Sequence, residues 1–329
     1  MSETRVSVVL ATYNSERFLR AQLASIQAQK LLPYELIVSD DASTDSTLAI
    51  VGDYKDVAQF SVCVLPHSER VGFTGNFARG LTFAHGELVA LCDSDDVWYP
   101  DRLSEIVALF GQHRALGLAS CDADLIDAGG NRLPGRLSDV SPRRGAFRDV
   151  NKAPFRVLLR GPMFPGMTMC FRADLLRYIL PIPAEWHHDA WIALIIAALA
   201  EVVFVPKPLV AYRCHDGQAT GVPGIVRTMP VSRLEARSRL LACIYRYRQL
   251  YDRMAELEGD CRNAHHVVRP LLEKLRHVEA RQIAYKSALA KRLYIVVKEL
   301  LAGKYSMYSS CGHAYHDLTC STDIPEIAY

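Results

Sequence analysis

The chain has 329 residues, which suits one large α/β domain with an extension or two modest domains. Half of the residues are hydrophobic and 22% are charged, which excludes an intrinsically disordered chain and an integral membrane bundle. The nine cysteines are scattered and none forms a Cys-x-x-Cys pair, so we expect a reducing cytosol and no zinc site.

The net charge of +2 is unevenly distributed along the chain. Residues 1–226 contain 21 basic and 25 acidic side chains, residues 227–304 contain 17 and 8, and residues 305–329 contain none and 3. The basic segment indicates an anionic surface or partner, or else a solvated helical face. We expect a domain over residues 1–226, a basic helical extension over 227–304 and a tail over 305–329.

The first 125 residues alternate between strand-like and helix-like patterns. Strands are predicted at 6–10, 35–38, 60–65 and 87–91, and helices at 15–29, 43–53, 73–84 and 100–110. This alternation predicts a doubly wound, mainly parallel sheet flanked by helices, with ligands at the carboxyl ends of its strands. Residues 128–162 predict loops, a strand resumes near 167–171, and residues 232–304 predict two or three helices.

Two segments bear on membranes. Residues 1–5 lead directly into a strand and carry no secretion signal. The longest apolar run, 190–205, has 16 residues, whereas a bilayer span needs about 20, so it predicts a buried helix followed by a strand. We therefore expect a cytoplasmic protein.

Polar residues follow the first two predicted strands. Thr12-Tyr13-Asn14 ends the first strand, and Asp40-Asp41 ends the second. Adjacent carboxylates repel one another and lose hydration when buried, so packing explains them poorly. They could accept the imide N–H of a pyrimidine base, or Asp41 or Ser43 could cap the following helix.

A second acidic motif, Asp93-Ser94-Asp95-Asp96, follows the fourth predicted strand. Mg²⁺ and Mn²⁺ typically bind one or two carboxylates together with substrate phosphates. A capping role for Asp96 would leave the other two aspartates unexplained. The motif therefore indicates a site for a divalent cation and a diphosphate.

Two later motifs carry candidate chemistry. Asp189 opens an apolar helix, where it could be a general base toward a hydroxyl or an ordinary helix cap. Farther along, Arg213 could meet phosphate and His215 could bind a metal, although a plain loop histidine is the common alternative.

Together these segments resemble the inverting glycosyltransferases of family 2, which have the GT-A fold. The resemblance covers roughly residues 5–221. It rests on Thr12-Tyr13-Asn14, Asp40-Asp41 with Ser43 and Asp45, Gly72 with Asn76, Asp93-Ser94-Asp95-Asp96 with Trp98 and Pro100, and His188-Asp189-x-Trp191. The last element, with Tyr212-Arg213-x-His215-x-x-Gln218, is most similar to the branch that transfers rhamnose from a dTDP donor, where Asn is commoner at the Gln218 position.

The resemblance implies a role for each matching residue. Thr12 and Asp41 would hold the pyrimidine base, supported by Asp40 and Asn14. The implied nucleotide-binding set is Thr12, Tyr13, Asn14, Asp40, Asp41, Arg70, Asn76, Asp93 and Ser94. Asp95 and His215 would bind Mg²⁺ or Mn²⁺, and Asp189 would be the catalytic base. The implied donor and acceptor site comprises Gly166, Met167, Thr168, His188, Trp191 and Arg213.

The implied activity is inverting sugar transfer from dTDP-rhamnose to a hydroxyl of a glycan or lipid-linked saccharide, in the synthesis of cell-surface polysaccharide or lipopolysaccharide. A UDP-hexose or UDP-N-acetylhexosamine donor is the alternative. A nucleotidylyltransferase would carry a glycine-rich loop at residues 11–16, which lack glycine, and a non-catalytic binding subunit predicts loss of Asp95 or Asp189. The basic helices could contact the cytoplasmic face of a membrane or pack on protein, including a second copy, and we expect no nucleic-acid partner.

Overall fold

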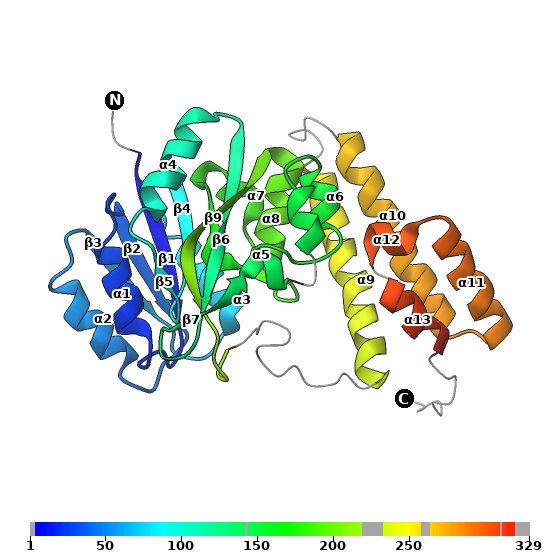
Figure 1. Cartoon of the computed structure of the whole chain (residues 1–329), viewed down its shortest axis with the longest axis horizontal. Helices are drawn as coiled ribbons and strands as arrows, with labels where there is room; N and C mark the ends of the chain where they lie inside the picture. Colours follow the sequence, from blue (N-terminus) through cyan, green and yellow to red (C-terminus); the bar gives the residue numbers. More distant parts are fainter. Residues whose placement is uncertain (1–3, 142–143, 219–232, 258–263, 310, 320–329) are drawn as a thin grey trace. The chain divides into compact units, whose positions relative to one another are not determined.

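The computed structural model describes residues 4–141, 144–218, 233–257, 264–309 and 311–319 (Figure 1). The chain folds into two compact units. Unit 1 comprises residues 1–154 and 162–228, and unit 2 comprises residues 155–161 and 229–329. The short segment 155–161 therefore groups with the C-terminal helices rather than with its neighbours in the sequence.

One mixed sheet forms the centre of unit 1. Within the described residues its strands follow the order β3-β2-β1-β4-β8-β6-β9-β5, and β7 pairs with β6. The neighbours among β1 to β4 are parallel, whereas β8 runs antiparallel between β4 and β6. The strands are β1 (Val6–Thr12), β2 (Glu35–Asp40), β3 (Ser61–Pro66), β4 (Leu88–Asp93), β5 (Val97–Trp98), β6 (Leu116–Ile126), β7 (Arg132–Arg136), β8 (Met169–Arg172) and β9 (Glu201–Arg213).

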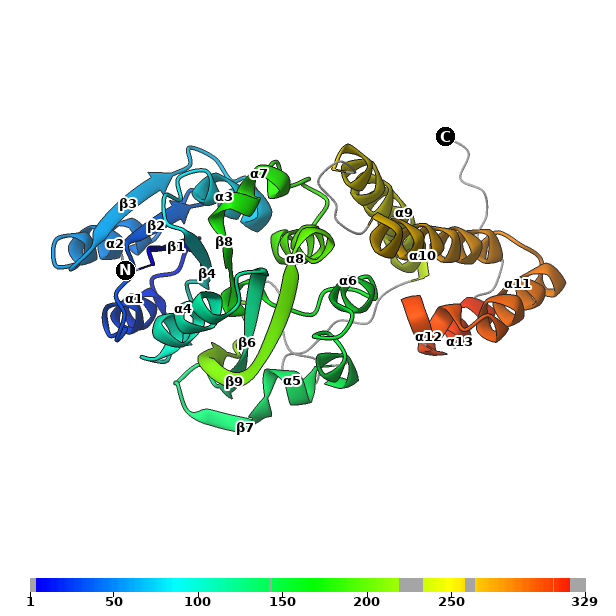
Figure 2. The ribbon, with the colours of Figure 1, turned by 90° about the horizontal axis from the view of Figure 1, so that it is seen from above.

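Helices cover both faces of this sheet, which confirms the predicted α/β class. α1, α2 and α4 lie on one face, and α3 and α8 lie on the other (Figures 1 and 2). Right-handed crossovers explain the split, because α1 and α2 lead outward from β1 to β3 whereas α3 returns the chain to β4. The helices are α1 (Leu19–Gln27), α2 (Thr47–Lys55), α3 (Gly72–Leu81), α4 (Arg102–Gln112), α5 (Leu137–Val140), α7 (Leu176–Ile179) and α8 (His188–Leu199).

The predicted strands β1 and β2 coincide with runs that are buried on both faces, whereas the edge strand β3 is partly exposed. Val8, Val9 and Leu10 of β1 are fully buried, as expected for a parallel strand with helices on each side. The predicted loop region 128–162 differs, because it contains β7, α5 and a 3₁₀ turn over Arg144–Arg148. The apolar run 190–205 forms most of α8 and the start of β9, as predicted.

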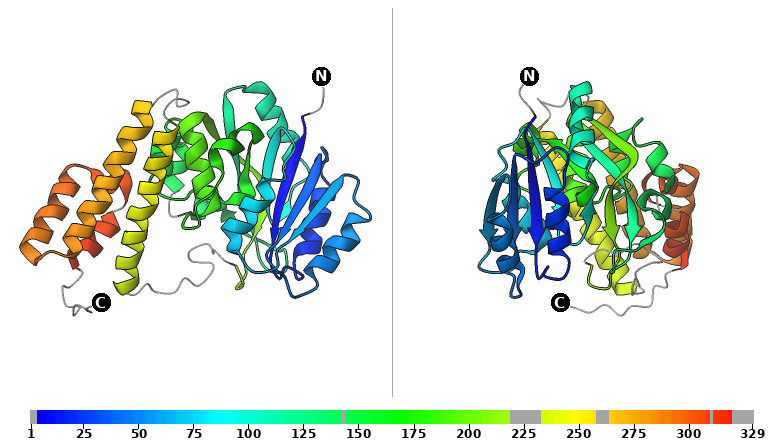
Figure 3. Two further views of the ribbon diagram at one scale, coloured as in Figure 1. Left: turned by 180° about the vertical axis from the view of Figure 1, so that it is seen from behind. Right: turned by 60° about the vertical axis from the view of Figure 1, so that its left-hand side comes forward.

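Unit 2 is helical in its described residues. The long helices α9 and α10 lie side by side (Figure 3), and Leu240, Ile244 and Val278 pack together between them. The expected tail contains two short helices, and Tyr305 and Tyr308 of the first are buried. The helices are α6 (Pro154–Leu158), α9 (Arg233–Glu256), α10 (Ala264–Tyr285), α11 (Leu289–Leu301), α12 (Lys304–Tyr308) and α13 (Cys311–Thr319). No helix in the described part of the chain has the length and apolarity that a bilayer crossing requires.

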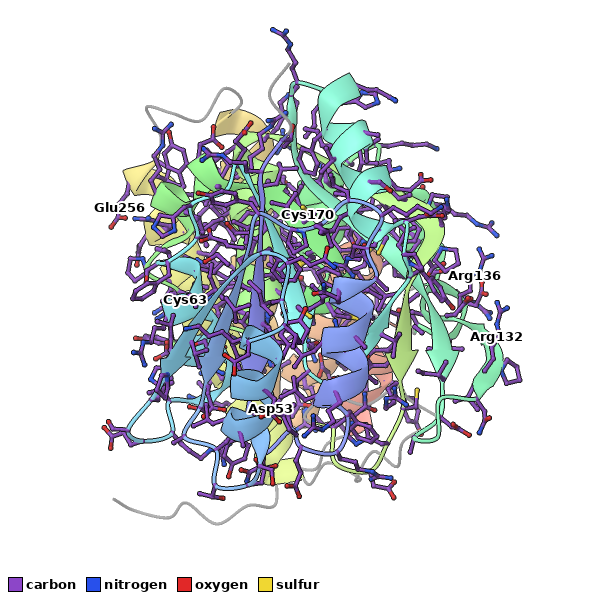
Figure 4. All side chains as sticks on the ribbon, turned by 90° about the vertical axis from the view of Figure 1, so that its left-hand side faces the viewer. Asp53, Cys63, Arg132, Arg136, Cys170 and Glu256 are labelled. Carbon is purple, nitrogen blue, oxygen red and sulfur yellow. The ribbon has the colours of Figure 1, made fainter. Side chains whose placement is uncertain are left out.

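The cysteines that the structure describes are free thiols. They are Cys63, Cys92, Cys121, Cys170, Cys214 and Cys243. Cys170 lies within the sheet, while Cys63 lies on β3 (Figure 4). Burial raises the pKa of the Cys170 thiol to about 12, so this side chain acts as a small apolar group in the core.

Close packing of α3 against the sheet generates a stability prediction. A Cβ added at Gly80 would lie 2.6 Å from Val9 Cγ1, whereas nothing lies within 4 Å of a Cβ at Gly52 of α2. Gly80→Ala should therefore lower the free energy of unfolding by about 1–3 kcal/mol, because Val9 is held in the core. Gly52→Ala, the control, should raise it by about 0.5–1 kcal/mol through helix propensity. Urea unfolding measures both, and equal effects would contradict the tight α3 contact.

Candidate active site

The carboxyl ends of three parallel strands meet at one edge of the sheet. Thr12 at the end of β1 pairs in register with Asp40 of β2, and Ala11 pairs with Asp93 of β4. The motifs that follow these strands therefore lie near one another. In open α/β sheets this edge is where ligands bind.

Asp40 is a structural carboxylate at this edge. It is fully buried and accepts hydrogen bonds from Thr12 Oγ1 at 2.7 Å, Ser43 N at 2.8 Å and Ser43 Oγ at 2.6 Å. The Ser43 hydroxyl in turn accepts the backbone N–H of Asn14 at 2.9 Å. Asn14 and Ala42 both have left-handed backbone conformations, which these bonds hold in place. Asp40 thus fixes the two turns that carry the Thr12 and Asp41 motifs.

Asp41 connects the second strand to the start of α3. Its carboxylate accepts the backbone N–H of Val71 at 2.6 Å and of Gly72 at 3.1 Å, and Arg70 Nε lies 3.6 Å away. The Arg70 guanidinium lies 3.7 Å from the centre of the Tyr13 ring, a cation–π contact on an exposed surface. The arrangement brings the Thr12 and Gly72 motifs together.

Asn76 of α3 reaches the same edge from the other side. Its Nδ2 donates to the carbonyl of Thr12 at 3.2 Å. Its Oδ1 is buried and has no hydrogen-bond partner among the described residues. A buried acceptor without a donor is costly, so this oxygen is a candidate contact for a ligand N–H or O–H.

The acidic motif after β4 gathers carboxylates that repel one another. Burial, with repulsion from Asp95 and Asp189, raises the pKa of Asp93 to about 7. Burial, with repulsion from Asp95 and Asp93, raises the pKa of Asp96 well above its usual range, and Asp96 Oδ2 has no partner among the described residues. Asp189 therefore lies near the acidic motif although it is 96 residues beyond Asp93 in the sequence.

Asp95 and His215 form a pair on the accessible side of this cluster. His215 Nε2 lies 3.0 Å from Asp95 Oδ2, and the His215 ring packs on Phe18 with 4.7 Å between ring centres. Nearby, Ser94 Oγ shares a hydrogen bond of 2.7 Å with Ser15 Oγ. Carboxylate oxygen and imidazole nitrogen are both suitable ligands for Mn²⁺, and a carboxylate oxygen suits Mg²⁺.

Arg213 contacts both the acidic motif after β4 and a neighbouring loop, mainly through their main-chain carbonyl groups. The side chain donates to the carbonyls of Asp95 at 2.6 Å and of Asp127 and Ala128 at 3.2 Å, and the backbone N–H donates to Asp96 Oδ1 at 2.9 Å. The sequence predicts a phosphate contact for this guanidinium. In the structure the guanidinium is directed at carbonyl oxygens, because Arg213 ends β9 beside the loops that carry Asp95 and Asp127.

Arg102 is a residue near the site that sequence reasoning missed. It is buried beneath the acidic motif, stacks on Trp98 at 3.9 Å and donates to the carbonyls of Met167 and Leu91. Its charge partly offsets the rise in the pKa of Asp93 and Asp96. The sequence signal for its burial is that Arg102 has the helical spacing of the buried apolar residues of α4.

The start of α8 places Asp189 next to a buried histidine. His188 stacks on Phe77 of α3 with 4.0 Å between ring centres, and neither ring nitrogen has a partner among the described residues. Burial lowers the pKa of His188 to about 4, so the ring is neutral at physiological pH. Asp189 is partly exposed, and its Oδ1 accepts the N–H of Ala190 at 2.6 Å.

The residues expected to line the donor and acceptor site divide into two groups. Gly166 faces His188, since an added Cβ would lie 2.7 Å from His188 Nε2. Met167 is a core residue, and the Thr168 hydroxyl bonds to Ser120 Oγ at 2.8 Å. Trp191 is also in the core, where its Nε1 donates to the carbonyl of Ile179. Met167, Thr168 and Trp191 therefore pack in the interior behind the site, because they lie on the buried side of their segments.

The protein groups at Asp95 and His215 suit a cation that also binds the substrate. Within the described residues, no three His, Cys, Asp or Glu side chains converge to hold a metal ion by themselves. A Mg²⁺ or Mn²⁺ ion that keeps phosphate oxygens and water as its other ligands needs no more than these two protein ligands. The donor set therefore fits the predicted cation.

The fold resembles that of a solved structure that binds a nucleotide sugar. S. aureus TarS 1–349, solved in complex with UDP-GlcNAc, matches with a TM-score of 0.58 and 19% sequence identity over 89% of this chain and 78% of that one. At this level of identity the match establishes the GT-A type of fold, as predicted.

Sequence relatives and a family model agree with this fold. An uncharacterized glycosyltransferase of Nostoc sp. is 27% identical over 64% of this chain and 65% of its own length. A dTDP-rhamnosyl transferase of Shigella flexneri, RfbG, is 32% identical over 30% of this chain and 35% of its own length. The chain thus spans about a third to two thirds of these relatives. The model described as "Glycosyl transferase family 2" matches residues 7–164, so this region of the chain is similar to glycosyltransferase family 2.

Proposed function

We propose that this protein transfers a sugar, with inversion, from a nucleotide-diphosphate donor to a hydroxyl of a glycan or lipid-linked saccharide in cell-surface polysaccharide or lipopolysaccharide synthesis. The convergence of Asp41, Asp95 and Asp189 at one sheet edge carries this proposal. Asp93 pairs with Ala11 near the end of β1, and the negative charges of Asp95 and Asp189 both raise its pKa. This proximity supports a common site for nucleotide, cation and acceptor.

The nucleotide would bind beside the ends of β1 and β2. Thr12 and Asp41 would hold the pyrimidine, and the exposed Tyr13–Arg70 pair offers a flat surface for stacking. Asp40 and Asn14 would keep the two turns in place, as their hydrogen bonds suggest. Asn76 Oδ1 has unused acceptor capacity at this edge, and Asp93 and Ser94 would meet the ribose.

Asp95 and His215 would hold Mg²⁺ or Mn²⁺ against the donor diphosphate. When bound, the cation would neutralise the negative charge that develops on the departing diphosphate. Arg213 keeps the Asp95 main chain in position, and Arg102 supplies positive charge below the carboxylates. The two arginines thereby let like charges share a small volume.

Asp189 would remove the proton from the acceptor hydroxyl. Its position in the first turn of α8 leaves Oδ2 without a hydrogen bond to the described residues, while Oδ1 accepts the N–H of Ala190. A single base opposite the leaving group gives one displacement and hence inversion, unlike the double displacement of retaining glycosidases. His188 and Gly166 would lie beside the reacting sugar, with the neutral imidazole able to donate one hydrogen bond and accept another.

The donor is expected to be dTDP-rhamnose, supported by the His188-Asp189-x-Trp191 motif and by similarity to the Shigella dTDP-rhamnosyl transferase. Thermal unfolding with Mn²⁺ and a panel of dTDP- and UDP-sugars tests this choice. We expect stabilisation by dTDP-rhamnose of about 3 kcal/mol at a hundredfold excess over Kd. Stabilisation by UDP-hexose or UDP-N-acetylhexosamine alone would identify a UDP-sugar, rather than dTDP-rhamnose, as the donor. No response to any of these nucleotides would contradict the proposed function.

Replacement of the proposed base should separate binding from chemistry. Asp189→Asn should lower kcat by about 10²–10⁴-fold, because the acceptor proton loses its receiver, while nucleotide affinity changes little. Asp174→Asn, an exposed aspartate of the same unit, is the control and should keep full activity. Steady-state transfer assays and nucleotide titrations provide the two measurements. Near-normal turnover in Asp189→Asn would show that another group accepts the proton.

Replacement of the proposed cation ligands should weaken the binding of the metal ion. His215→Ala and Asp95→Asn should each raise the Mn²⁺ concentration for half-maximal activity at least tenfold, and excess EDTA should abolish transfer. His113→Ala removes an exposed histidine of unit 1 and should leave the Mn²⁺ titration unchanged. An identical titration curve for all three variants would remove Asp95 and His215 from the cation site.

A further inference from the structure

Helix α11 of unit 2 presents its apolar side chains to solvent. Leu289 is 69% exposed and Leu301 is 85% exposed, and the residues between them continue the same face at helical spacing. We refer to this face as the α11 stripe. It consists of Leu289, Leu293, Tyr294, Val297, Leu300 and Leu301.

The opposite face of α11 is held inward by polar contacts. Arg292 is buried and donates to the carbonyl of Ser287 at 3.3 Å. Glu299 bonds to His277 Nδ1 of α10 at 2.7 Å, and His277 Nε2 reaches Ser309 Oγ at 2.9 Å. With Val296, these residues fix the rotation of the helix. These contacts on the inner face of α11 therefore keep the α11 stripe on the outside of unit 2.

Lysines border the α11 stripe. Lys291 and Lys298 are exposed, two turns apart, at the edge of the stripe, and Lys286 is exposed just before the helix. In the described part of the chain none of these lysines forms an ion pair, and Glu299, the acidic residue of α11, faces inward. The outer face of α11 is thus apolar and positively charged, with no compensating carboxylate.

We propose that α11 binds the surface of an anionic lipid bilayer. The helix would lie in the plane of the interface, with the α11 stripe among the acyl chains and the lysines at the headgroups. Its 13 residues extend about 20 Å, which suits an interfacial helix and is too short for a span. A two-fold contact between copies through the same face would instead bring their lysines together, so the charge favours lipid. This inference goes beyond the transfer reaction and does not depend on it.

Flotation of the full-length protein with vesicles tests the proposal. We expect binding to vesicles of phosphatidylcholine with about one third phosphatidylglycerol, and at least tenfold weaker binding to phosphatidylcholine alone. Leu289→Glu/Leu293→Glu should abolish flotation, because it places charge in the stripe. Lys291→Glu/Lys298→Glu should weaken binding to the anionic vesicles about tenfold or more and should have little effect on the residual binding to neutral ones.

Matched measurements keep the outcome interpretable. All substituted positions are exposed, so circular dichroism should show an unchanged helical content. Val57→Glu places the same charge at an exposed apolar residue of unit 1 and should bind vesicles as the parent protein does. Flotation that is equal for the parent and the Leu289/Leu293 variant would overturn the proposal. So would a dimer in light scattering that the same variant dissociates, if the parent does not bind anionic vesicles.

Discussion

Repulsion among carboxylates at the end of β4 is the constraint around which unit 1 is built. Asp93, Asp95 and Asp96 lie close together, with Asp189 near Asp93, and burial together with mutual repulsion raises the pKa of Asp93 and Asp96. Arg102 and Arg213 stabilise the arrangement through main-chain carbonyls, and neither appears in an ion pair with these aspartates in the described residues. Positive charge is therefore supplied from nearby while carboxylate oxygens stay available to a ligand.

Helix α3 links the two halves of the candidate site. The backbone N–H of Gly72 at its start donates to Asp41, Asn76 reaches the carbonyl of Thr12, and Phe77 stacks on His188. The side chain of Thr74 also donates to the carbonyl of Trp186, just before α8. The proposed nucleotide and base positions are thus connected through one short helix, and Gly80 lets that helix approach the sheet closely.

Local sequence patterns were sufficient to predict the first strands and to find the carboxylates at their ends, because each of these features involves only a few consecutive residues. They were insufficient where the partner is distant in the sequence. Arg213 finds carbonyls 85 to 118 residues away, and Trp191 and Met167 turn into the core rather than toward the site. The burial of Arg102 also depends on Trp98 and on the later segment that carries Met167.

The bonding of Asp40 limits how such a site can diversify. Both of its oxygens are already engaged by Thr12 and Ser43, so a substitution there would loosen two turns together. Tyr13 and Arg70, in contrast, are exposed and contact each other mainly through their flat faces. Substitutions at Tyr13 and Arg70 would therefore be tolerated more readily than substitutions at Asp40, because only the latter would release the turns beneath the surface.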